Sequence, residues 1–338
     1  MRKSGTEYIA SYLYIYLKEH SDRDHRLTTA QICSFLEEND LPSERRSVYK
    51  AVDILRSAGA DIRYQRSRNS TGFWLEGRFT PAECLFLKQS AETSYAISPE
   101  GTKKLSEKIG SLLSEHQRRM IGMNDIEASK TDNPHVLEYA DILITAASRQ
   151  RIVEFMYYDL TLNRVRTYRG SDRKYRMMPY GVVTDNGRYY CIMYSKEHGS
   201  FVNFRIDKMD RLELTGETEQ RKPFDLQSHM RSSFRMYHGE AQTVIIRFNI
   251  NMAQIVLDEF GTDMIITAVD DRSFTAALRT AVTPTLIGWL LQFEDRLTVL
   301  SPAETINKLR SVAVRILASY PEEEENNGRQ DPGASEDH

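Results

Sequence analysis

The sequence predicts a mixed α+β protein of several domains, and three observations carry this prediction. Apolar residues recur at helical spacing in the first third of the chain, and the period changes to two after residue 150. Gly, Pro and Asn mark turns between the short alternating segments. The chain has 338 residues, 40% of them hydrophobic. At roughly 150 residues per domain, this length gives two or three domains with cores of their own.

Shifts in pattern and composition divide the chain into smaller segments. In chain order, we expect a winged helix-turn-helix at 1–78, a helical linker at 79–134, a small β-barrel at 135–215, a second linker at 216–240, an α+β domain of ferredoxin-like order at 241–320 and an acidic tail at 321–338.

The first segment begins with three helical patterns. Residues 8–18 carry one apolar stripe, and Thr28 or Thr29 can cap a second helix. Ser43 is expected to cap the third helix, and Gly59 to end it in a left-handed conformation.

A predicted hairpin follows the third helix. Residues 61–66 and 72–76 resemble strands, and the polar tip between them has the composition of a turn. Helix, helix, turn, helix and hairpin are the element order of a winged helix.

The linker carries two further helical patterns. Thr80 and Glu83 fit a capping box with proline at the first helical position, and this helix runs to about Ala96. A second helix is expected to end near Gly122, and residues 125–134 form a polar connection.

The remaining elements follow from alternation and turn residues. A helix is expected at 135–149. Strands are expected at 151–158, 164–168, 175–184, 188–195 and 201–207, and Asn186-Gly187 is a hairpin turn. The last domain is predicted as strand 241–250, helix 252–260, strand 264–269, strand 273–280, helix 283–291, strand 297–300 and helix 302–319. We expect residues 221–239 to be an irregular linker.

Charge and cysteine content exclude several classes of protein. The net charge is −3, but residues 321–338 alone hold seven acids and one arginine, so that this tail is expected to be disordered. The three cysteines are far apart, which argues against a disulfide framework or a zinc site. The beginning of the sequence has no apolar signal segment, and we expect a cytoplasmic protein.

A basic, hydrogen-bonding surface is predicted on the third helix and the hairpin. Residues 40–70 hold seven cations and four acids. A helix entering the major groove needs polar side chains for base edges and cations for phosphates. The candidate DNA-binding residues are Ser43, Arg45, Arg46, Ser47, Tyr49, Lys50, Arg63, Arg66, Arg68 and Asn69. The alternative is a solvated helix and hairpin in an interaction module.

The predicted barrel is also basic and rich in tyrosine. Residues 151–211 hold twelve cations, seven acids and eight tyrosines. Arginine forks bind phosphate and aromatic rings stack on bases, so this composition suits an anionic, nucleotide-like ligand. A sheet with one charged face and tyrosines at its rim explains the composition equally well.

Several segments resemble bacterial WYL-type transcriptional regulators. Residues 46–50 (RSVYK) stand in the register of the family's S.RTxYRDL pattern, and residues 72–75 (GFWL) resemble the GYxL that closes the wing. Residues 176–183 (RMMPYGVV) and 186–191 (NGRYYC) resemble the core of the WYL domain, and residues 204–209 (FRIDKM) resemble its ending. The naming tripeptide is altered here to Tyr189-Tyr190-Cys191.

The resemblance covers about residues 6–320, including the extension that follows WYL domains. It implies a homodimeric regulator with an SH3/Sm-like barrel that senses a nucleic-acid or nucleotide-like effector. By motif position, it assigns effector contacts to Arg176, Tyr180, Tyr189, Arg205, Asp207 and Lys208. Asp207 has a second interpretation, as a structural partner that orients Arg205.

Catalytic patterns are missing from the sequence. None of the eight histidines has a ligand partner three or four residues away, and the nucleophile-elbow and phosphate-loop motifs do not occur. We therefore expect a regulator without enzymatic activity, cofactor or metal, which binds double-stranded DNA. The alternatives are an RNA or single-strand binding protein whose main site is the barrel, and an enzyme acting on nucleotides.

Overall fold

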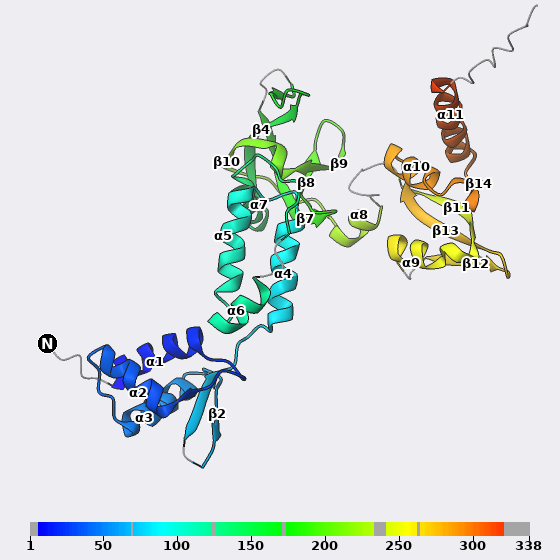
Figure 1. The fold of residues 1–338 in the computed structure, drawn as a ribbon. Coiled ribbons are helices and arrows are strands. Elements are labelled where there is room, and N and C mark those ends of the chain that lie inside the picture. The colour runs from blue at the N-terminus through cyan, green and yellow to red at the C-terminus, as the bar shows by residue number, and fades with distance from the viewer. Residues whose placement is uncertain are drawn as a thin grey trace, which may run out of the picture. The chain divides into compact units, whose positions relative to one another are not determined.

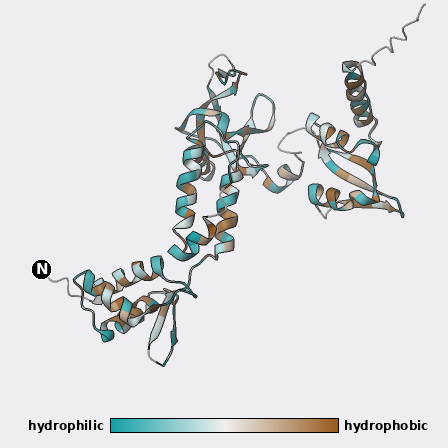
Figure 2. Cartoon of the chain, viewed as in Figure 1, coloured by the Kyte–Doolittle hydropathy of each residue, from teal (hydrophilic) through white to brown (hydrophobic). Residues whose placement is uncertain are grey.

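The computed structural model describes residues 6–68, 70–122, 126–170, 174–232, 241–261 and 264–320. The chain divides into two compact units, Met1–Arg221 and Lys222–His338, which are considered separately here. Eleven α-helices and several small antiparallel sheets make up the described residues, so the fold is mixed α and β (Figure 1). Teal and brown residues alternate along the helices in Figure 2, as is typical of amphipathic helices.

The first unit begins with a small helical module closed by a three-stranded sheet. Its elements are α1 (Thr6–His20), β1 (Leu27–Thr28), α2 (Thr29–Glu38), α3 (Arg45–Ser57), β2 (Ile62–Arg66) and β3 (Thr71–Leu75). The strands lie in the order β1-β3-β2, and all are antiparallel. The core of this module contains Leu13, Leu17, Ile32, Leu36, Val48, Ile62 and Phe73.

The helix caps of this module confirm two predictions and correct one. Thr28, rather than Thr29, caps α2 in a capping box with Gln31. Gly59 follows α3 at a φ of 93°, which is the left-handed conformation expected there. The prediction that Ser43 caps α3 is wrong, because the cap position is Glu44. The Glu44 carbonyl accepts the Ser47 and Val48 amides and so closes the first turn one residue later than predicted.

Three linker helices follow: α4 (Pro81–Thr93), α5 (Pro99–Gly110) and α6 (Glu115–Ile121). The capping box predicted at Thr80 and Glu83 is present. The single helix expected to end near Gly122 is wrong, because the structure divides it into α5 and α6. Ser114 begins α6 with a capping box of its own.

Contacts between α6 and the N-terminal module lie within this unit. The Ser114 hydroxyl donates to the buried Asp22 carboxylate at 2.6 Å. The His25 and His116 rings stack at 3.8 Å between centroids, and Arg118 pairs with Glu19 at 2.9 Å. Burial acts to raise the pKa of Asp22, but hydrogen bonds from Ser114 and His25 outweigh it and lower the pKa.

The rest of the first unit packs one helix against two small sheets. Its elements are α7 (Val136–Ser148), β4 (Arg151–Leu160), β5 (Arg166–Tyr168), β6 (Tyr175–Met177), β7 (Pro179–Asp185), β8 (Arg188–Ser195), β9 (Ser200–Arg205), a 3-10 turn (Ile206–Lys208) and β10 (Met209–Thr218). One sheet has the order β10-β4-β5 with β6 on β4, and the other has the order β7-β8-β9.

Two strand predictions in this part are wrong. The strand expected at 175–184 is split at Met178, because β6 pairs with β4 while β7 pairs with β8. The second error is the omission of β10, whose pairing with β4 shifts register twice and whose Arg211 has a φ of 50°. Such irregularities break the alternation that reveals a strand in a sequence. Seven strands therefore occupy the described part of this region, instead of the five expected.

The second unit contains one antiparallel sheet and its helices. Its elements are α8 (Leu226–Ser232), β11 (Ala241–Asn249), α9 (Ala253–Phe260), β12 (Ile265–Val269), β13 (Ser273–Ala281), α10 (Pro284–Leu291), β14 (Leu297–Ser301) and α11 (Ala303–Ser319). The strand order is β12-β13-β11-β14, and the core includes Val244, Ile246, Phe248, Trp289 and Leu290. The prediction of an irregular linker at 221–239 is wrong for Leu226–Ser232, which form the helix α8. The acidic tail lies outside the described residues.

Candidate nucleic-acid interface and effector site

The N-terminal end of α3 presents cations to solvent. Arg45, Arg46, Tyr49 and Lys50 are exposed, whereas Val48 is buried in the core. The first turn of α3 contains no acidic residue, so cations and the positive end of the helix dipole coincide. This end of α3 therefore attracts anions such as phosphate. Ser47 is half-buried, and so is Ser43, which precedes the cap.

The hairpin β2–β3 divides the predicted wing residues between two faces. Arg66 and Tyr64 pair with Thr71 and Phe73, so these four side chains share one face. The Tyr49 hydroxyl of α3 donates to Thr71 Oγ1 at 3.2 Å, which places this face toward α3.

Arg63 lies on the opposite face of the hairpin, directly across from Trp74. It forms an ion pair with Asp61 at 2.7 Å. Arg68 is exposed at the tip, and Asn69 lies outside the described residues.

The structure adds Arg56 and Arg26 to the basic surface. The guanidinium carbon of Arg56, on the last turn of α3, lies 5.8 Å from the Tyr64 ring centroid, and that of Arg66 lies 5.6 Å from it. On the other hairpin face, Arg26 lies 5.1 Å from the Trp74 ring centroid. Ten residues separate Arg56 from Arg46, so its position beside the wing could be found only from the fold.

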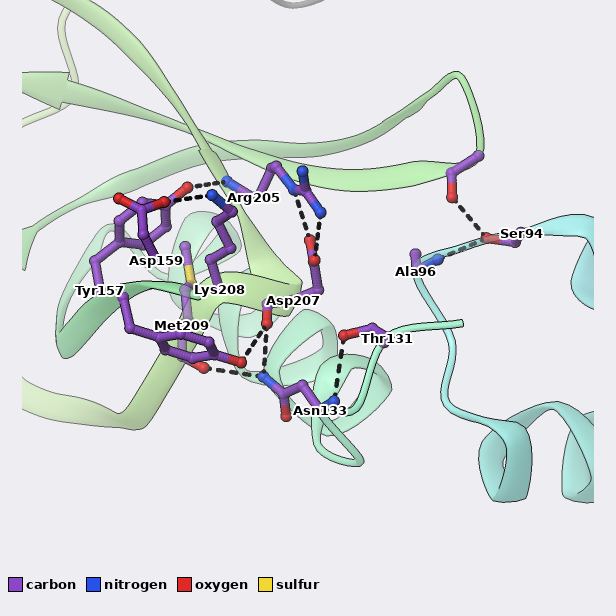
Figure 3. Close-up of polar contacts among 12 residues, drawn as sticks. Ser94, Ala96, Thr131, Asn133, Tyr157, Asp159, Arg205, Asp207, Lys208 and Met209 are labelled. Carbon is purple, nitrogen blue, oxygen red and sulfur yellow. Dashed lines mark hydrogen bonds and ion pairs between the residues drawn. The ribbon is translucent and has the colours of Figure 1, made fainter. Parts of the chain in front are cut away.

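Arg205 is the last residue of β9, and the nearly buried carboxylate of Asp207 holds its guanidinium group in place. Its Nε and Nη2 atoms donate to the two Asp207 oxygens at 3.0 and 2.6 Å (Figure 3). The Arg205 side chain is 23% exposed and that of Asp207 is 4% exposed. Burial acts to lower the pKa of Arg205, but the hydrogen bonds to Asp207 outweigh burial and raise it. This geometry agrees with the second interpretation of Asp207, as the residue that orients Arg205.

The backbone around Asp207 is held as firmly as its side chain. The Asp207 carbonyl accepts hydrogen bonds from the Tyr158 hydroxyl at 2.9 Å and from Asn133 Nδ2 at 3.1 Å (Figure 3). The Tyr157 hydroxyl accepts the Arg205 amide at 3.2 Å, and burial raises the pKa of Tyr157 to about 12. These hydrogen bonds therefore fix the backbone from which the Arg205 side chain extends.

Lys208 belongs to a second charged cluster beside this pair. Its Nζ lies 2.5 Å from Asp159 Oδ1, and Arg169 Nε lies 2.6 Å from Asp159 Oδ2. Hydrogen bonds from Arg169 and then from Lys208 lower the pKa of Asp159 to about 2. Two cations thus share one carboxylate, which leaves an excess positive charge here.

Strand pairing separates the two tyrosines of the altered tripeptide. Tyr190 lies directly opposite Arg205, and its pKa is raised, mainly by burial. Tyr189 lies on the other face, where it packs against the core with Ala91 and Ile97. The tripeptide residue beside Arg205 is therefore Tyr190, whereas the resemblance had assigned Tyr189 to the effector site.

The other two assigned residues have different surroundings. Arg176 on β6 is half-exposed and pairs with Glu154 at 3.4 Å and with Glu217 at 2.5 Å. Tyr180 is buried, and the guanidinium of Arg221 lies over its ring at 5.1 Å. Arg205, Asp207 and Lys208 thus lie together on the segment that joins β9 to β10. Arg176 and Tyr180 have other partners.

Tyr95 contacts this site from the loop between α4 and α5. The guanidinium carbons of Arg188 and Arg205 lie 4.4 and 5.6 Å from its ring centroid. The Ser94 hydroxyl and the Ala96 amide both donate to the Gly187 carbonyl, at 3.0 and 3.1 Å. Arg188, at the start of β8, follows Tyr95 by 93 residues, and nothing in the sequence pattern links the two.

Neither a candidate metal cluster nor a helix able to cross a membrane occurs in the described ranges. No group of three or more His, Cys, Asp or Glu side chains that could hold a metal ion occurs there. Among the helices that the structure describes, none is both long and apolar enough to cross a bilayer.

Comparison with known proteins identifies two domains. The WYL domain family matches residues 138–214, and the WCX domain family matches residues 240–317. The chain therefore contains a WYL domain followed by a WCX domain, which confirms the resemblance recognised from the motifs.

One solved structure with detectable similarity is proteasome accessory factor B/C of Arthrobacter aurescens, at 14% identity and a TM-score of 0.29. The match covers 94% of this chain and 49% of that protein, so this chain spans about half its length. With so low a TM-score, this similarity carries no argument about function. No curated protein matches the chain.

Proposed function

We propose that this protein is a transcriptional regulator that binds double-stranded DNA through an N-terminal winged helix. The observation that carries the proposal is the exposed basic N-terminal end of α3, together with Arg66 on the neighbouring hairpin face and Arg56, from the last turn of α3, beside Tyr64 on that face. The element order of three helices and a hairpin supports the winged-helix assignment, with α3 as the recognition helix.

The WYL domain is proposed to sense a nucleic-acid or nucleotide-like effector. Arg205, Lys208 and the neighbouring Arg188 supply positive charge, and Tyr190 supplies an aromatic ring beside them. Guanidinium groups bind phosphates and stack on bases, so this set suits such a ligand. An SH3/Sm-like barrel and a ferredoxin-like C-terminal domain remain proposals, the second supported by the strand order β12-β13-β11-β14.

We further propose a homodimer, formed through the linker helices, the C-terminal domain or both. The exposed side chains of Phe86 on α4 and Met120 on α6, 71% and 62% accessible, support the first arrangement. Each winged helix would then bind one half-site, with half-site centres about one helical turn, ~34 Å, or a multiple apart. Effector binding would shift the population between DNA-competent and incompetent dimers.

Binding of labelled duplex to variants of α3 tests the DNA proposal. Arg46→Ala or Lys50→Ala should weaken binding by ~1–3 kcal/mol if the side chain contacts a base. Lys104→Ala is the matched control, because Lys104 is an exposed helical cation that pairs with Glu100 on α5. If both α3 variants bind duplex as tightly as the control, α3 is not the recognition helix.

The second candidate is an RNA or single-strand binding protein whose main site is the WYL domain. The contact of two arginines with the Tyr95 ring favours it, because the same groups can hold an unpaired base. Comparing the affinities for duplex and single-stranded oligonucleotides of one sequence separates the two functions. Tighter single-strand binding that survives the α3 substitutions would favour this candidate.

A further inference from the structure

The contact between Tyr95 and the WYL domain has the chemistry of a ligand complex. The guanidinium groups of Arg188 and Arg205, which we name the arginine clamp, both lie over one aromatic ring. Arginine guanidinium groups form such contacts with tyrosine rings, and they also stack on nucleobases. The clamp is thus built to hold a flat ring, and a ring from the same chain occupies it.

The clamp retains positive charge that Tyr95 does not neutralise. Arg205 is paired with Asp207, whereas Arg188 lies opposite Asp185 across the hairpin turn and, within the described ranges, forms no ion pair closer than 4 Å. The Tyr95 side chain is neutral, so it satisfies the ring preference of the clamp and leaves the charge of Arg188 unmatched. A ligand with both a base and a phosphate satisfies both.

The loop that carries Tyr95 is attached by polar contacts and by the buried side chains of Ala96 and Ile97, which pack against Tyr189. Two hydrogen bonds end on the Gly187 carbonyl, and the Tyr95 carbonyl accepts the Thr131 amide at 2.9 Å. Lys130 Nζ donates to the carbonyls of Ala91 and Ser94 at 2.8 and 2.9 Å and so closes the end of α4. None of these contacts involves the Tyr95 ring, so the ring can leave the clamp by a side-chain rotation while the loop stays attached.

Helix α4 connects this loop to the wing. It starts at Pro81, shortly after β3 ends at Leu75, and it ends at Thr93, directly before the loop. Thirteen residues of α-helix span about 20 Å. One continuous helix therefore connects the loop that carries Tyr95 with the N-terminal module.

We propose that Tyr95 occupies the position of a nucleobase in the arginine clamp and competes with the effector base for it. This inference rests on the proposed effector function and names its regulation. A single-stranded nucleic acid places one base on Arg188 and Arg205 and a phosphate near Arg188. The Tyr95 ring then leaves the clamp.

The test is the affinity of the full-length protein for a short fluorescent single-stranded oligodeoxynucleotide. For a ligand that needs the open clamp, the apparent dissociation constant rises in inverse proportion to the open fraction. Tyr95→Ala should therefore bind about tenfold tighter than wild type, the factor that ~1.4 kcal/mol of ring docking gives. Tyr95→Phe keeps the ring and should bind like wild type.

Controls separate the role of the ring from other effects. Arg188→Ala should weaken binding in the Tyr95→Ala background, because the clamp loses one arm. Tyr14→Ala, which removes a 40% exposed tyrosine on α1, should leave the affinity unchanged. An oligonucleotide with abasic sites should show little gain with Tyr95→Ala, because it offers no ring. Circular dichroism confirms that each variant is folded.

The outcomes distinguish this inference from the effector proposal on which it rests. If wild type binds the oligonucleotide and Tyr95→Ala binds no tighter, the competition is refuted and the effector proposal stands. An equal gain with the abasic strand also refutes the competition. If neither wild type nor Tyr95→Ala binds, the effector proposal and the competition both fail. Binding by Tyr95→Ala alone supports both.

Discussion

The Arg205–Asp207 pair provides the sharpest prediction for the WYL domain. Arg205→Ala leaves the Asp207 carboxylate, 4% exposed, without its two charged hydrogen bonds. Removing one partner of a buried ion pair costs about 3–5 kcal/mol, because the remaining charge is desolvated and unpaired. Since Arg205 itself is 23% exposed, we expect a value near the lower end, about 3 kcal/mol.

This cost translates into a large shift in melting temperature. For a cooperative unit of about 150–250 residues, 1 kcal/mol corresponds to about 2–4 °C. The first unit spans Met1–Arg221, so Arg205→Ala should lower its Tm by about 6–12 °C in a circular dichroism melt. Combining Arg205→Ala with Asp207→Asn removes the unpaired charge and should recover most of the loss.

The matched control is Arg176→Ala in the same domain. Arg176 is 50% exposed and pairs with Glu154 and Glu217, and such surface pairs contribute about 0–1 kcal/mol. Its melting temperature should therefore stay within about 4 °C of wild type. If Arg205→Ala melts no lower than Arg176→Ala, Asp207 does not depend on Arg205 and the account of this pair is wrong.

Two further predictions concern charged groups in the first unit. Hydrogen bonds from Arg169 and Lys208 lower the pKa of Asp159 to about 2, so its stabilisation is present above the ordinary pKa of ~3.9 and is lost as the pH falls toward 2. Carbon-13 NMR at pH ~4 should find this carboxyl ionised in wild type and partly protonated in Lys208→Ala; equal ionisation would contradict the assignment. Ser114→Ala removes a 2.6 Å hydrogen bond to the buried Asp22 carboxylate and should lower the free energy of unfolding by about 2 kcal/mol in urea, whereas an unchanged midpoint would show that this contact is unimportant.

Local signals in the sequence predicted many of the elements. The cap at Thr28 or Thr29, the capping box at Thr80 and the turn at Asn186-Gly187 depend on residues within four positions of each other, and the structure contains all three, with Thr28 as the cap. The WYL motifs placed the family correctly because they keep their order along the chain. Caps and tight turns can be predicted from the sequence because the side chain and the backbone that interact lie within one turn of each other.

The errors arose where long-range pairing decides the structure. The division between β6 and β7 arises because β6 pairs with β4 and β7 pairs with β8. The sequence around Met178 does not indicate this change of partner. Strand register also places Tyr189 toward the core and Tyr190 opposite Arg205, and the assignment of Tyr189 to the effector site stays a prediction. A single residue of register exchanges the two faces, so composition could not separate them.

The site around Tyr95 was beyond sequence reasoning for a similar reason. Its contacts with Arg188 and Arg205 join a linker loop to a hairpin far along the chain. The composition of the WYL region indicated cations and aromatic rings, but the ring in the clamp comes from outside that region. Only the fold shows that the linker helices and the candidate effector site are directly connected.

The dependence of duplex affinity on salt concentration tests the central proposal most directly. The surface around α3 and the wing exposes Arg45, Arg46, Lys50, Arg56, Arg66 and Arg68. Each phosphate neutralised contributes about −0.9 to the slope of log affinity against log salt, so we expect a slope of about −3 or steeper. Arg46→Ala should make that slope shallower by about one unit if it contacts a phosphate. A wild-type slope near zero would contradict DNA binding by this surface.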